Sequence, residues 1–449
     1  LLAAAAVTLQ GLSDVLAPLG ERFATADHEL YLVGGSVRDA VLGRLGNDLD
    51  FTTDARPDEI TRLLTGWVDA IWDTGIEFGT ISARKGDVMI EITTFRADQY
   101  DRVGRNPEVT FGDSLEADLV RRDFTMNAMA VAIGPTGPAE FHDPLDGMTA
   151  LLAGIIDTPA TPQESFNDDP LRMLRAVRFV SQLGFRLAPR VFDAITEMAD
   201  EINRITAERV HAELDKLILG EHPIEAIDVM VETGLAQRVL PEVPGMKLTI
   251  DEHHQHKDVY WHSLKVLGNA VELERERGME PNLELRWAAL MHDIGKPETR
   301  DFNENGNVTF YQHEVVGARM TRHRLRALKY SKQHIKDISE LVRLHMRFHG
   351  FGENQWTDSA VRRYVTDAGD LLPRLHKLVR ADCTTRNAKK ARRLQRTYDQ
   401  LEERIEEIGR KEDLARVRPD LDGNEIMEIL DLKPGPEVGK AWKYLKELR

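Results

Sequence analysis

Residues 29–133 carry a pattern of apolar and polar positions that switches between short strands and short helices. The run ELYLV is continuously apolar apart from its first residue and predicts a buried strand that ends at Gly34 and Gly35. The following SVRDAVLG predicts a short helix, with Ser36 as its cap and Gly43 as its terminator. Three further runs, LDFTT, TISAR and VMIEITTF, are rich in Ile, Val, Thr and Phe, which favours strands.

The pattern changes twice further along the chain. The segment from Pro135 to Gly147 is dense in Pro and Gly and predicts turns, so the mixed region should end near residue 158. From Asp168 onward apolar residues recur at helical spacing, and almost all of the remaining sequence follows that period. The segment from Pro241 to Gly245 is expected to be a linker. The sequence therefore predicts an α+β chain in which a mixed sheet precedes helices.

Composition narrows the class of protein. The chain has 449 residues, of which 42% are hydrophobic and 30% charged, as in an ordinary globular protein. Its single cysteine, Cys383, excludes a disulfide framework and a thiolate zinc site, and favours a reducing, cytoplasmic location. The apolar start, LLAAAAVTLQ, lacks a preceding basic region, and no run reaches the roughly 18 apolar residues of a membrane helix. We expect no membrane segment.

Charge is distributed unevenly along the chain. The formal net charge of −16, taken alone, argues against a nucleic-acid partner. However, one stretch is basic and could hold an RNA backbone, although a solvated helix face remains an equal alternative. It contains Arg374, Lys377, Arg380, Arg386, Lys389, Lys390, Arg392, Arg393 and Arg396. A second cluster consists of Arg172, Arg175 and Arg178.

The strongest chemical signal is the stretch LVGGSVRDAVLGRLGNDLDFTT. Gly34 and Gly35 lack Cβ atoms and open a helix, so their amides could approach an anion, and Arg38 lies one turn further on. Asp48 and Asp50 are two apart in a strand-like run, which places both carboxylates on one face. Two carboxylates so close repel each other unless a cation such as Mg²⁺ compensates them.

These residues resemble the first motif of the class II polymerase-beta-like nucleotidyltransferases, the CCA-adding enzymes and bacterial poly(A) polymerases. Further matches follow in the family's order, at residues 90–96, 121–130, 141–151, 168–185 and 206–218. Glu91 is on the opposite face from its apolar neighbours and is a candidate third carboxylate. The motif FHDPLDGMTAL resembles the family's turn with Asp143, Asp146 and Gly147. The resemblance covers most of residues 29–240.

The resemblance implies phosphoryl transfer from CTP and ATP to the 3′ end of tRNA, with release of pyrophosphate. Asp48, Asp50 and Glu91 are the implied catalytic residues, with Mg²⁺ held by Asp48 and Asp50. The implied nucleotide-binding residues are Gly34, Gly35, Arg38, Arg121, Arg122, Asp123, Asn127, Asp169, Arg172, Arg175 and Arg178.

The resemblance assigns base selection to Asp169 and Arg172, which we expect to be neighbours three apart on a helix. An Asp accepts and an Arg donates, and both cytosine and adenine offer an amino donor beside a ring-nitrogen acceptor. Uracil and guanine present the reverse order and would be rejected. Nucleotide contacts are implied at both Arg175 and Arg178, of which Arg175 is the better candidate. Asp168 stands where the family usually has Glu, a departure that leaves Asp169 and Arg172 intact.

A histidine-rich region follows the nucleotidyltransferase motifs. His292 and Asp293 lie in WAALMHDIGKPETR, an apolar run that predicts a helix ending at Gly295 and Pro297, and the region resembles the HD phosphohydrolases. The implied ligands are His262, His292, Asp293, His313, His345 and Asp382. Neutral imidazoles with carboxylates suit Mn, Fe, Co, Ni or Zn, so a second divalent metal site is expected. Whether this site hydrolyses a phosphoester or serves as scaffold stays open. His253, His254 and His256 are interpreted as part of a solvated linker.

On this basis we expect four parts: a nucleotidyltransferase catalytic head (1–158), a helical nucleotide-selecting and RNA-binding neck (159–245), an HD metal-binding domain (246–385) and a helical tail (386–449). The favoured function is CCA addition to tRNA, because EFGTISARKGDVMIEITTFR looks like the CCA branch. The alternatives are a poly(A) polymerase, an enzyme adding only CC or only A, and an HD phosphohydrolase whose front domain only binds nucleotide. Monomer and homodimer both remain open.

Overall fold

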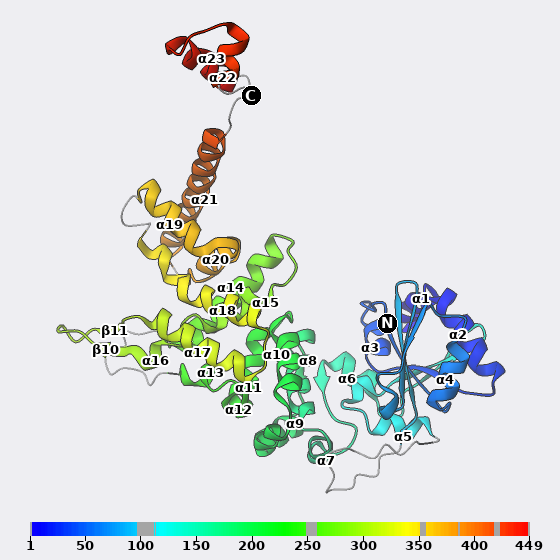
Figure 1. Cartoon of the computed structure of the whole chain (residues 1–449). Helices are drawn as coiled ribbons and strands as arrows, with labels where there is room; N and C mark the ends of the chain where they lie inside the picture. Colours follow the sequence, from blue (N-terminus) through cyan, green and yellow to red (C-terminus); the bar gives the residue numbers. More distant parts are fainter. Residues whose placement is uncertain are drawn as a thin grey trace. The chain divides into compact units, whose positions relative to one another are not determined.

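The protein is described here by a computed structural model, which covers residues 2–96, 112, 114–247, 258–350, 356–384, 387–416 and 423–447. Internal contacts divide the chain into two units. Unit 1 comprises Leu1–Lys247 and Arg324–Ser331, and unit 2 comprises Leu248–His323 and Lys332–Arg449. Figure 1 shows the large sheet near the N-terminus and helices through most of the rest, which confirms the α+β class.

A seven-stranded mixed sheet forms the front of unit 1. Its strand order is β3-β4-β5-β2-β1-β6-β7, and β2 and β5 are parallel whereas the other neighbours are antiparallel. The strands are β1 (Leu30–Val33), β2 (Asp48–Thr53), β3 (Ala70–Trp72), β4 (Thr80–Lys85), β5 (Val88–Thr94), β6 (Ala130–Gly134) and β7 (Gly137–His142). The four strands expected from the apolar runs are present as β1, β2, β4 and β5. By contrast, β7 lies in the segment expected to be turns, because Pro138 falls on an edge strand where a missing N–H is tolerated.

The two faces of the sheet differ in polarity. On one face Ile81, Ala83, Ile90 and Ile92 are fully buried. Helices α2 (Ser13–Thr25) and α4 (Pro57–Leu64) lie on the same side of the sheet in Figure 1 and bury apolar residues. The other face carries the polar residues of β2, β4 and β5, several of which are exposed. The alternation of burial along each strand therefore leaves one face of the sheet open for chemistry.

The rest of unit 1 is mainly helical. Its other helices are α1 (Leu2–Gln10), α3 (Gly35–Val41), α5 (Leu115–Val120), α6 (Gly147–Ala153), α7 (Pro162–Asp168), α8 (Leu171–Leu183), α9 (Pro189–Met198), α10 (Ala207–Ile218), α11 (Pro223–Glu232), α12 (Leu235–Val239) and α13 (Glu242–Gly245). A two-residue parallel pair joins β8 (Ile155–Ile156) to β9 (Arg186–Leu187). The segment expected to be a linker, Pro241 to Gly245, is helical instead. Pro241 is the N-cap of α13, and Val243 within this helix is buried in the core.

The described residues of unit 2 are mainly helical, with one hairpin of β10 (Arg300–Phe302) and β11 (Val308–Phe310). Its helices are α14 (Val259–Glu276), α15 (Leu283–Met291), α16 (Lys296–Thr299), α17 (His313–Ala327, which ends in unit 1), α18 (Lys332–Leu344), α19 (Asp358–Ala368), α20 (Leu372–Ala381), α21 (Ala388–Arg416), α22 (Gly423–Leu430) and α23 (Pro436–Glu447). The helix expected to end at Gly295 and Pro297 stops earlier, because α15 ends at Met291 and Pro297 opens α16. Within the described ranges no helix is long and apolar enough to cross a membrane.

Candidate active site and candidate metal centre

The turn between β1 and α3 brings backbone close to charged side chains. Gly34 has φ of +66°, and a Cβ there would meet Nη1 of Arg122 at 2.9 Å. A Cβ on Gly35 would lie 3.5 Å from Nη2 of Arg38 and 4.0 Å from Oδ2 of Asp50. Glycine at both positions therefore leaves room beside a carboxylate and two guanidinium groups, as an anion-binding turn requires.

Ser36 joins this turn to the strand that carries the carboxylates. The expected helix cap is wrong, because Gly34 is the N-cap of α3 and Ser36 lies inside the helix. The Ser36 hydroxyl accepts a hydrogen bond from the Asp50 N–H at 2.9 Å and donates to the Asp48 carbonyl at 3.3 Å. It therefore holds α3 and β2 in fixed register. Gly43, with φ of +69°, follows the end of α3 as expected.

The carboxylates of β2 and β5 lie in one row. Asp50 is the register partner of Glu91 in the parallel pair, and Asp48 lies two residues before Asp50 on the same face. Burial raises the pKa of Asp50 to about 6, and Glu91 and then Asp48 add to the effect, whereas Arg122 and Arg38 oppose it. Asp50 is nonetheless exposed on its cavity side. Mutual repulsion of this kind is what a divalent cation relieves, so the donor set fits Mg²⁺.

A chain of buried hydrogen bonds links this turn to α8. Arg38 donates from Nη1 to Oδ1 of Asn127 at 2.7 Å, and Asn127 donates from Nδ2 to Oδ1 of Asp123 at 3.0 Å. Arg175 donates from Nε to Oδ2 of Asp123 at 2.9 Å. Burial alone would raise the pKa of Asp123, but the charge of Arg175 and the hydrogen bonds of Asn127 and Arg175 outweigh it and hold that pKa well below its usual range.

Two adjoining cavities lie at this place and share Gly35, Asp50, Asn127 and Arg175. The smaller, of about 180 Å³, is lined by Val33, Gly34, Gly35, Asp50, Phe51, Glu91, Thr93, Arg122, Asp123, Asn127 and Arg175. The larger, of about 610 Å³, is lined by Gly35, Arg38, Asp39, Arg44, Asp50, Asn127, Arg175, Arg178, Phe179, Gln182, Lys216, Leu219, Gly220 and Glu221. Their combined size falls in the usual range for a small-molecule site. Asp48 is exposed on the same face as Asp50 but lines neither cavity.

The two expected base-selecting residues are arranged differently from the prediction. Asp169 does not lie on the same helix as Arg172, because it ends α7 in an extended conformation and Pro170 caps α8. Its carboxylate accepts hydrogen bonds from the Leu171 N–H at 3.1 Å and from Nη2 of Arg209 at 2.7 Å. The proline between the helices breaks the helical register that the spacing suggested.

Arg172 has partners of its own. It donates to the Ser165 hydroxyl at 3.0 Å and to the Arg121 carbonyl at 2.8 Å. Neither Arg172 nor Asp169 lines the two cavities. The structure therefore places both residues next to the site, each held by another protein group.

The other expected arginines are also paired. Arg121 and Arg122 form ion pairs with Asp118, at 3.6 and 2.9 Å, and Arg122 also lines the smaller cavity. Arg178 forms a buried ion pair with Glu213 at 3.0 Å and lines the larger cavity. Burial lowers the pKa of Arg178 to about 10, against the opposing effect of Glu213.

Several site residues were not singled out by the sequence reasoning. Arg44 lies within the first motif, and Arg209, Glu213 and Lys216 lie within the segment at 206–218. The motif boundaries therefore contained the signal, but nothing in the local pattern indicated which side chains face the cavity. Asp143, also within a motif, accepts from the Gly147 N–H at 2.7 Å and so holds the start of α6.

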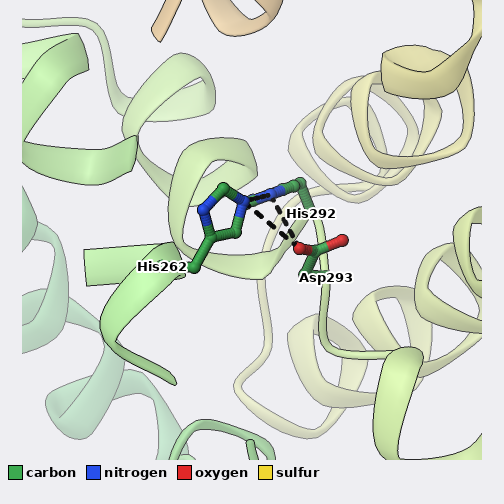
Figure 2. A group of neighbouring side chains, drawn as sticks. All are labelled: His262, His292 and Asp293. Atoms are coloured by element: carbon green, nitrogen blue, oxygen red, sulfur yellow. Dashed lines mark hydrogen bonds and ion pairs between the residues drawn. The ribbon is translucent and has the colours of Figure 1, made fainter. Parts of the chain in front are cut away.

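A second cluster of chemistry-bearing residues lies within unit 2 (Figure 2). His262, His292 and Asp293 offer ligand atoms that lie within 4.8 Å of one another, and so do Asp293, His313 and His345. Nε2 of His262 lies 3.2 Å from Nε2 of His292 and 3.4 Å from Oδ2 of Asp293. Nε2 of His313 lies 3.3 Å from Oδ1 of Asp293. The two oxygens of Asp293 therefore face two different groups of imidazoles.

The imidazoles are oriented by their other nitrogens. Nδ1 of His292, His313 and His345 hydrogen-bonds a backbone carbonyl, at 2.9, 2.9 and 2.6 Å, which leaves the Nε2 of each ring facing the cluster. Nδ1 of His262 lies 3.2 Å from the Thr384 hydroxyl. Oδ1 of Asp293 is buried with no hydrogen-bond partner among the described groups. Inward imidazole nitrogens around an unsatisfied carboxylate oxygen fit a metal centre.

Asp382 completes the expected set, with Oδ1 3.0 Å from Nε2 of His262. Burial would raise its pKa, but the hydrogen bond of His262 and the charge of His292 hold the pKa of Asp382 well below its usual range. Burial, together with the charge of His292, lowers the pKa of His345 to about 3, which keeps that ring neutral. All six predicted ligands are thus brought together by elements that are up to 120 residues apart in sequence.

The expected basic stretch is divided in the structure. Arg380 is held by Asp399 and Glu402 at 2.7 and 3.0 Å, which makes it part of the packing between helices. A cavity of about 830 Å³ is lined by Asn387, Lys389, Arg392, Arg393 and Arg396. Arg386 and the trio at His253, His254 and His256 lie outside the described residues.

Comparisons with known proteins agree with this arrangement. Three family models match: "Poly A polymerase head domain" at residues 30–157, "Probable RNA and SrmB- binding site of polymerase A" at 184–246, and "HD domain" at 259–387. The chain is 33% identical to an A-adding tRNA nucleotidyltransferase of Deinococcus radiodurans, over 93% of this chain and 91% of that protein.

Sequence identity to the CCA-adding relatives is higher, but the alignments cover a smaller share of each chain. The CCA-adding enzyme of Anoxybacillus flavithermus is 42% identical over 49% of this chain and 53% of its own length, so the chain spans about half of such relatives. The crystal structure of the Bacillus stearothermophilus CCA-adding enzyme in complex with CTP is 26% identical, with a TM-score of 0.61 over 96% of this chain and 90% of that one. The chain therefore belongs to the class II tRNA nucleotidyltransferases, the family of CCA-adding enzymes and bacterial poly(A) polymerases, and it combines the head, RNA-binding region and HD domain of that family.

Proposed function

We propose that the protein extends the 3′ end of tRNA without a template, adding C and A nucleotides from CTP and ATP and releasing pyrophosphate. The observation that carries this proposal is the register pair of Asp50 and Glu91, which faces a cavity beside the Gly34 and Gly35 turn. Asp48, Asp50 and Glu91 fit Mg²⁺, which when bound would activate the primer hydroxyl and neutralise the triphosphate.

The protein's own groups position the nucleotide. The amides of Gly34 and Gly35, with Arg38, would bind the triphosphate, and Asn127 keeps the Arg38 guanidinium in place. The 3′-hydroxyl oxygen then forms a bond to the α-phosphorus while the bond to pyrophosphate breaks on the opposite side. Because Ser36 ties the glycine turn to the strand that carries Asp48 and Asp50, the phosphate-binding turn and these carboxylates would be in place before substrate arrives.

Base selection is proposed for Asp169 and Arg172. Their carboxylate and guanidinium would pair with the amino donor and ring-nitrogen acceptor that cytosine and adenine share. To do so, Asp169 must replace its hydrogen bond from Arg209 with one from the base, and Arg172 must give up its hydrogen bond to Ser165. The Asp169–Arg209 pair is partly exposed, and such pairs are worth about 1 kcal/mol or less, so this exchange is energetically accessible.

The proposal is tested by offering the protein three tRNAs, ending before CCA, after C and after CC, with CTP and ATP separately and together. We expect stepwise completion to CCA and no further growth. The full-length similarity to an A-adding enzyme favours a second candidate, which would extend only the tRNA that ends in CC. Unlimited addition of A would indicate a poly(A) polymerase. Asp50→Asn should abolish all products, whereas Asp58→Asn on the outer helix α4 should not.

We also propose that the HD cluster binds one or two divalent transition metal ions and hydrolyses a phosphoester. The support is geometric, since two groups of ligands share Asp293 in unit 2. When bound, a metal ion there would supply an activated water. The test measures hydrolysis of bis-p-nitrophenyl phosphate after loading with Mn²⁺, Co²⁺, Ni²⁺ or Zn²⁺. Activity lost in Asp293→Ala and kept in Asp50→Asn supports the proposal, and metal binding without hydrolysis would reduce the site to a scaffold.

A further inference from the structure

The carboxylate row continues across the sheet to an aromatic residue. Glu91 on β5 is the register partner of Ser82 on β4, and Ser82 is the partner of Trp72 on β3. Asp50 on β2 pairs with Glu91 from the other side. Cross-strand partners project from the same face of a sheet, so these four side chains form one continuous row. The row ends at Trp72, because β3 is the edge strand.

Trp72 is exposed on this face without an evident structural reason. Three strand spacings of about 4.8 Å place its backbone roughly 14 Å from that of Asp50. The alternate residues on β4 and β5 are buried on the opposite face, whereas Trp72 is 41% exposed. A large aromatic side chain that shares a sheet face with the Asp50 and Glu91 carboxylates offers an apolar ring to a ligand on that face.

The direction of the reaction indicates what reaches this surface. The glycine turn and Arg38 lie on the β1 side of β2, and that side would hold the triphosphate. In an in-line displacement the attacking hydroxyl comes from the side opposite the leaving pyrophosphate. The RNA 3′ end must therefore arrive from the other side of β2, over β5 and β4, and the nucleotides behind it lie toward β3.

A cation lies in the neighbouring row of the same face. Arg84 on β4 is the register partner of Met89 on β5 and of Ala70 on β3, and Met89 is in turn the partner of Asp48. Arg84 is exposed and forms no ion pair with any residue that the structure describes. An unpaired guanidinium beside an exposed aromatic ring matches the phosphate and base of a single-stranded nucleic acid.

We propose that Trp72 stacks on a base near the 3′ end of the RNA substrate, while Arg84 contacts the adjacent backbone. This inference rests on the proposed nucleotidyltransferase function. Stacking on an aromatic ring is tolerant of sequence, because every base offers a π-face. A primer whose last bases change with each added nucleotide requires a contact of this kind. Trp72 thus acts on the RNA and not on the incoming nucleotide.

The test separates the two substrates. For Trp72→Ala, acting on a tRNA that ends before CCA, we expect the KM for RNA to rise about five- to fifty-fold, as loss of one stacked base implies. The KM for CTP should stay within twofold of wild type. Trp72→Phe should restore most of the RNA affinity, and Arg84→Gln should weaken RNA binding mainly at low salt. Trp261→Ala in unit 2 is the matched control, because that residue is also exposed, at 51%.

A binding measurement in the absence of nucleotide keeps this inference separate from the proposed function. The dissociation constant of the same tRNA, measured for wild type and the four variants, should follow the order of the KM values. An affinity of Trp72→Ala within twofold of wild type overturns the stacking role. If wild type adds no nucleotide but loses RNA affinity on Trp72→Ala, the RNA surface stands and the proposed transfer reaction falls. CTP binding by Trp72→Ala at wild-type affinity shows that the variant is folded.

Discussion

Arg209 donates a hydrogen bond from Nη2 to Oδ2 of Asp169 at 2.7 Å, so α10 holds the residue that we propose selects the base. The contact joins residues 40 positions apart, and it occupies the carboxylate that a cytosine or adenine amino group would need. In the resting arrangement Arg209 therefore competes with an incoming base for this carboxylate.

Asp169→Ala should relax the choice of nucleotide. Removing the acceptor deletes a hydrogen bond to the correct base and removes the penalty for a wrong one, so the kcat/KM ratio of CTP to UTP should fall by at least about tenfold. Pyrophosphate release with CTP should slow less than that. Arg209→Met is the comparison variant, since it frees Asp169 without deleting it and should keep the CTP preference. Unchanged discrimination in Asp169→Ala would remove the side-chain template.

Asp50 should make the stability of the protein depend on pH in the absence of Mg²⁺. Its folded-state pKa of about 6 lies above the value of about 3.9 for an unfolded Asp. The folded state therefore binds this proton more tightly, and the carboxyl favours folding below about pH 4 and loses that contribution as pH rises through 6. In EDTA, the difference in thermal midpoint between Asp50→Asn and wild type should grow between pH 4.5 and 7. A difference independent of pH contradicts this.

The buried pair of Asp123 and Arg175 should support both folding and nucleotide binding. Asp123→Ala leaves the Arg175 guanidinium uncompensated and Asn127 without its acceptor, which should lower the free energy of unfolding by about 3 kcal/mol. Arg175→Met should lower the free energy of unfolding as well. In the double variant the loss should be smaller than the sum, because neither charge is left alone. Denaturant unfolding of all four proteins measures this, and strict additivity argues against a direct pair.

Metal content should follow the two groups of ligands in unit 2. Asp293 belongs to both groups, so Asp293→Ala should lose all transition metal after dialysis. His262→Ala and His345→Ala each affect one group and should each lose about half of a wild-type content of two ions. Elemental analysis by mass spectrometry gives the stoichiometry. Nucleotide addition should be unchanged in all three variants, and loss of that activity would indicate that the HD cluster supports the transferase.

Sequence alone was sufficient for features that depend on local geometry. The period of two in a strand determines that Asp48 and Asp50 share a face, whatever the partner strand is. Apolar periodicity likewise predicted strands β1, β2, β4 and β5 and the change to helices after them, and the motifs indicated the family. The six HD ligands were identifiable because their residue types and order match those of the HD phosphohydrolases, even though separate segments of the chain supply them.

Predictions from the local sequence pattern were wrong where a residue distant in sequence determines the local structure. Pro170 ends one helix before the next begins, so the spacing of Asp169 and Arg172 did not make them partners. Serine before an apolar run is typical of a helix cap, but the Ser36 hydroxyl accepts a hydrogen bond from the Asp50 N–H of β2 instead. The strand at Gly137–His142 forms despite its Pro and Gly content, because β6 provides the hydrogen bonds.

The sequence by itself determined which residue types are present and which way they face along a strand or helix, because those depend on bonds between near neighbours. Only the tertiary structure decided that Asn127 bridges Arg38 and Asp123, and that Trp72 extends the row of Asp50 and Glu91. Strand order, register and hydrogen bonds over long separations depend on how the whole core packs, and no local pattern contains that information.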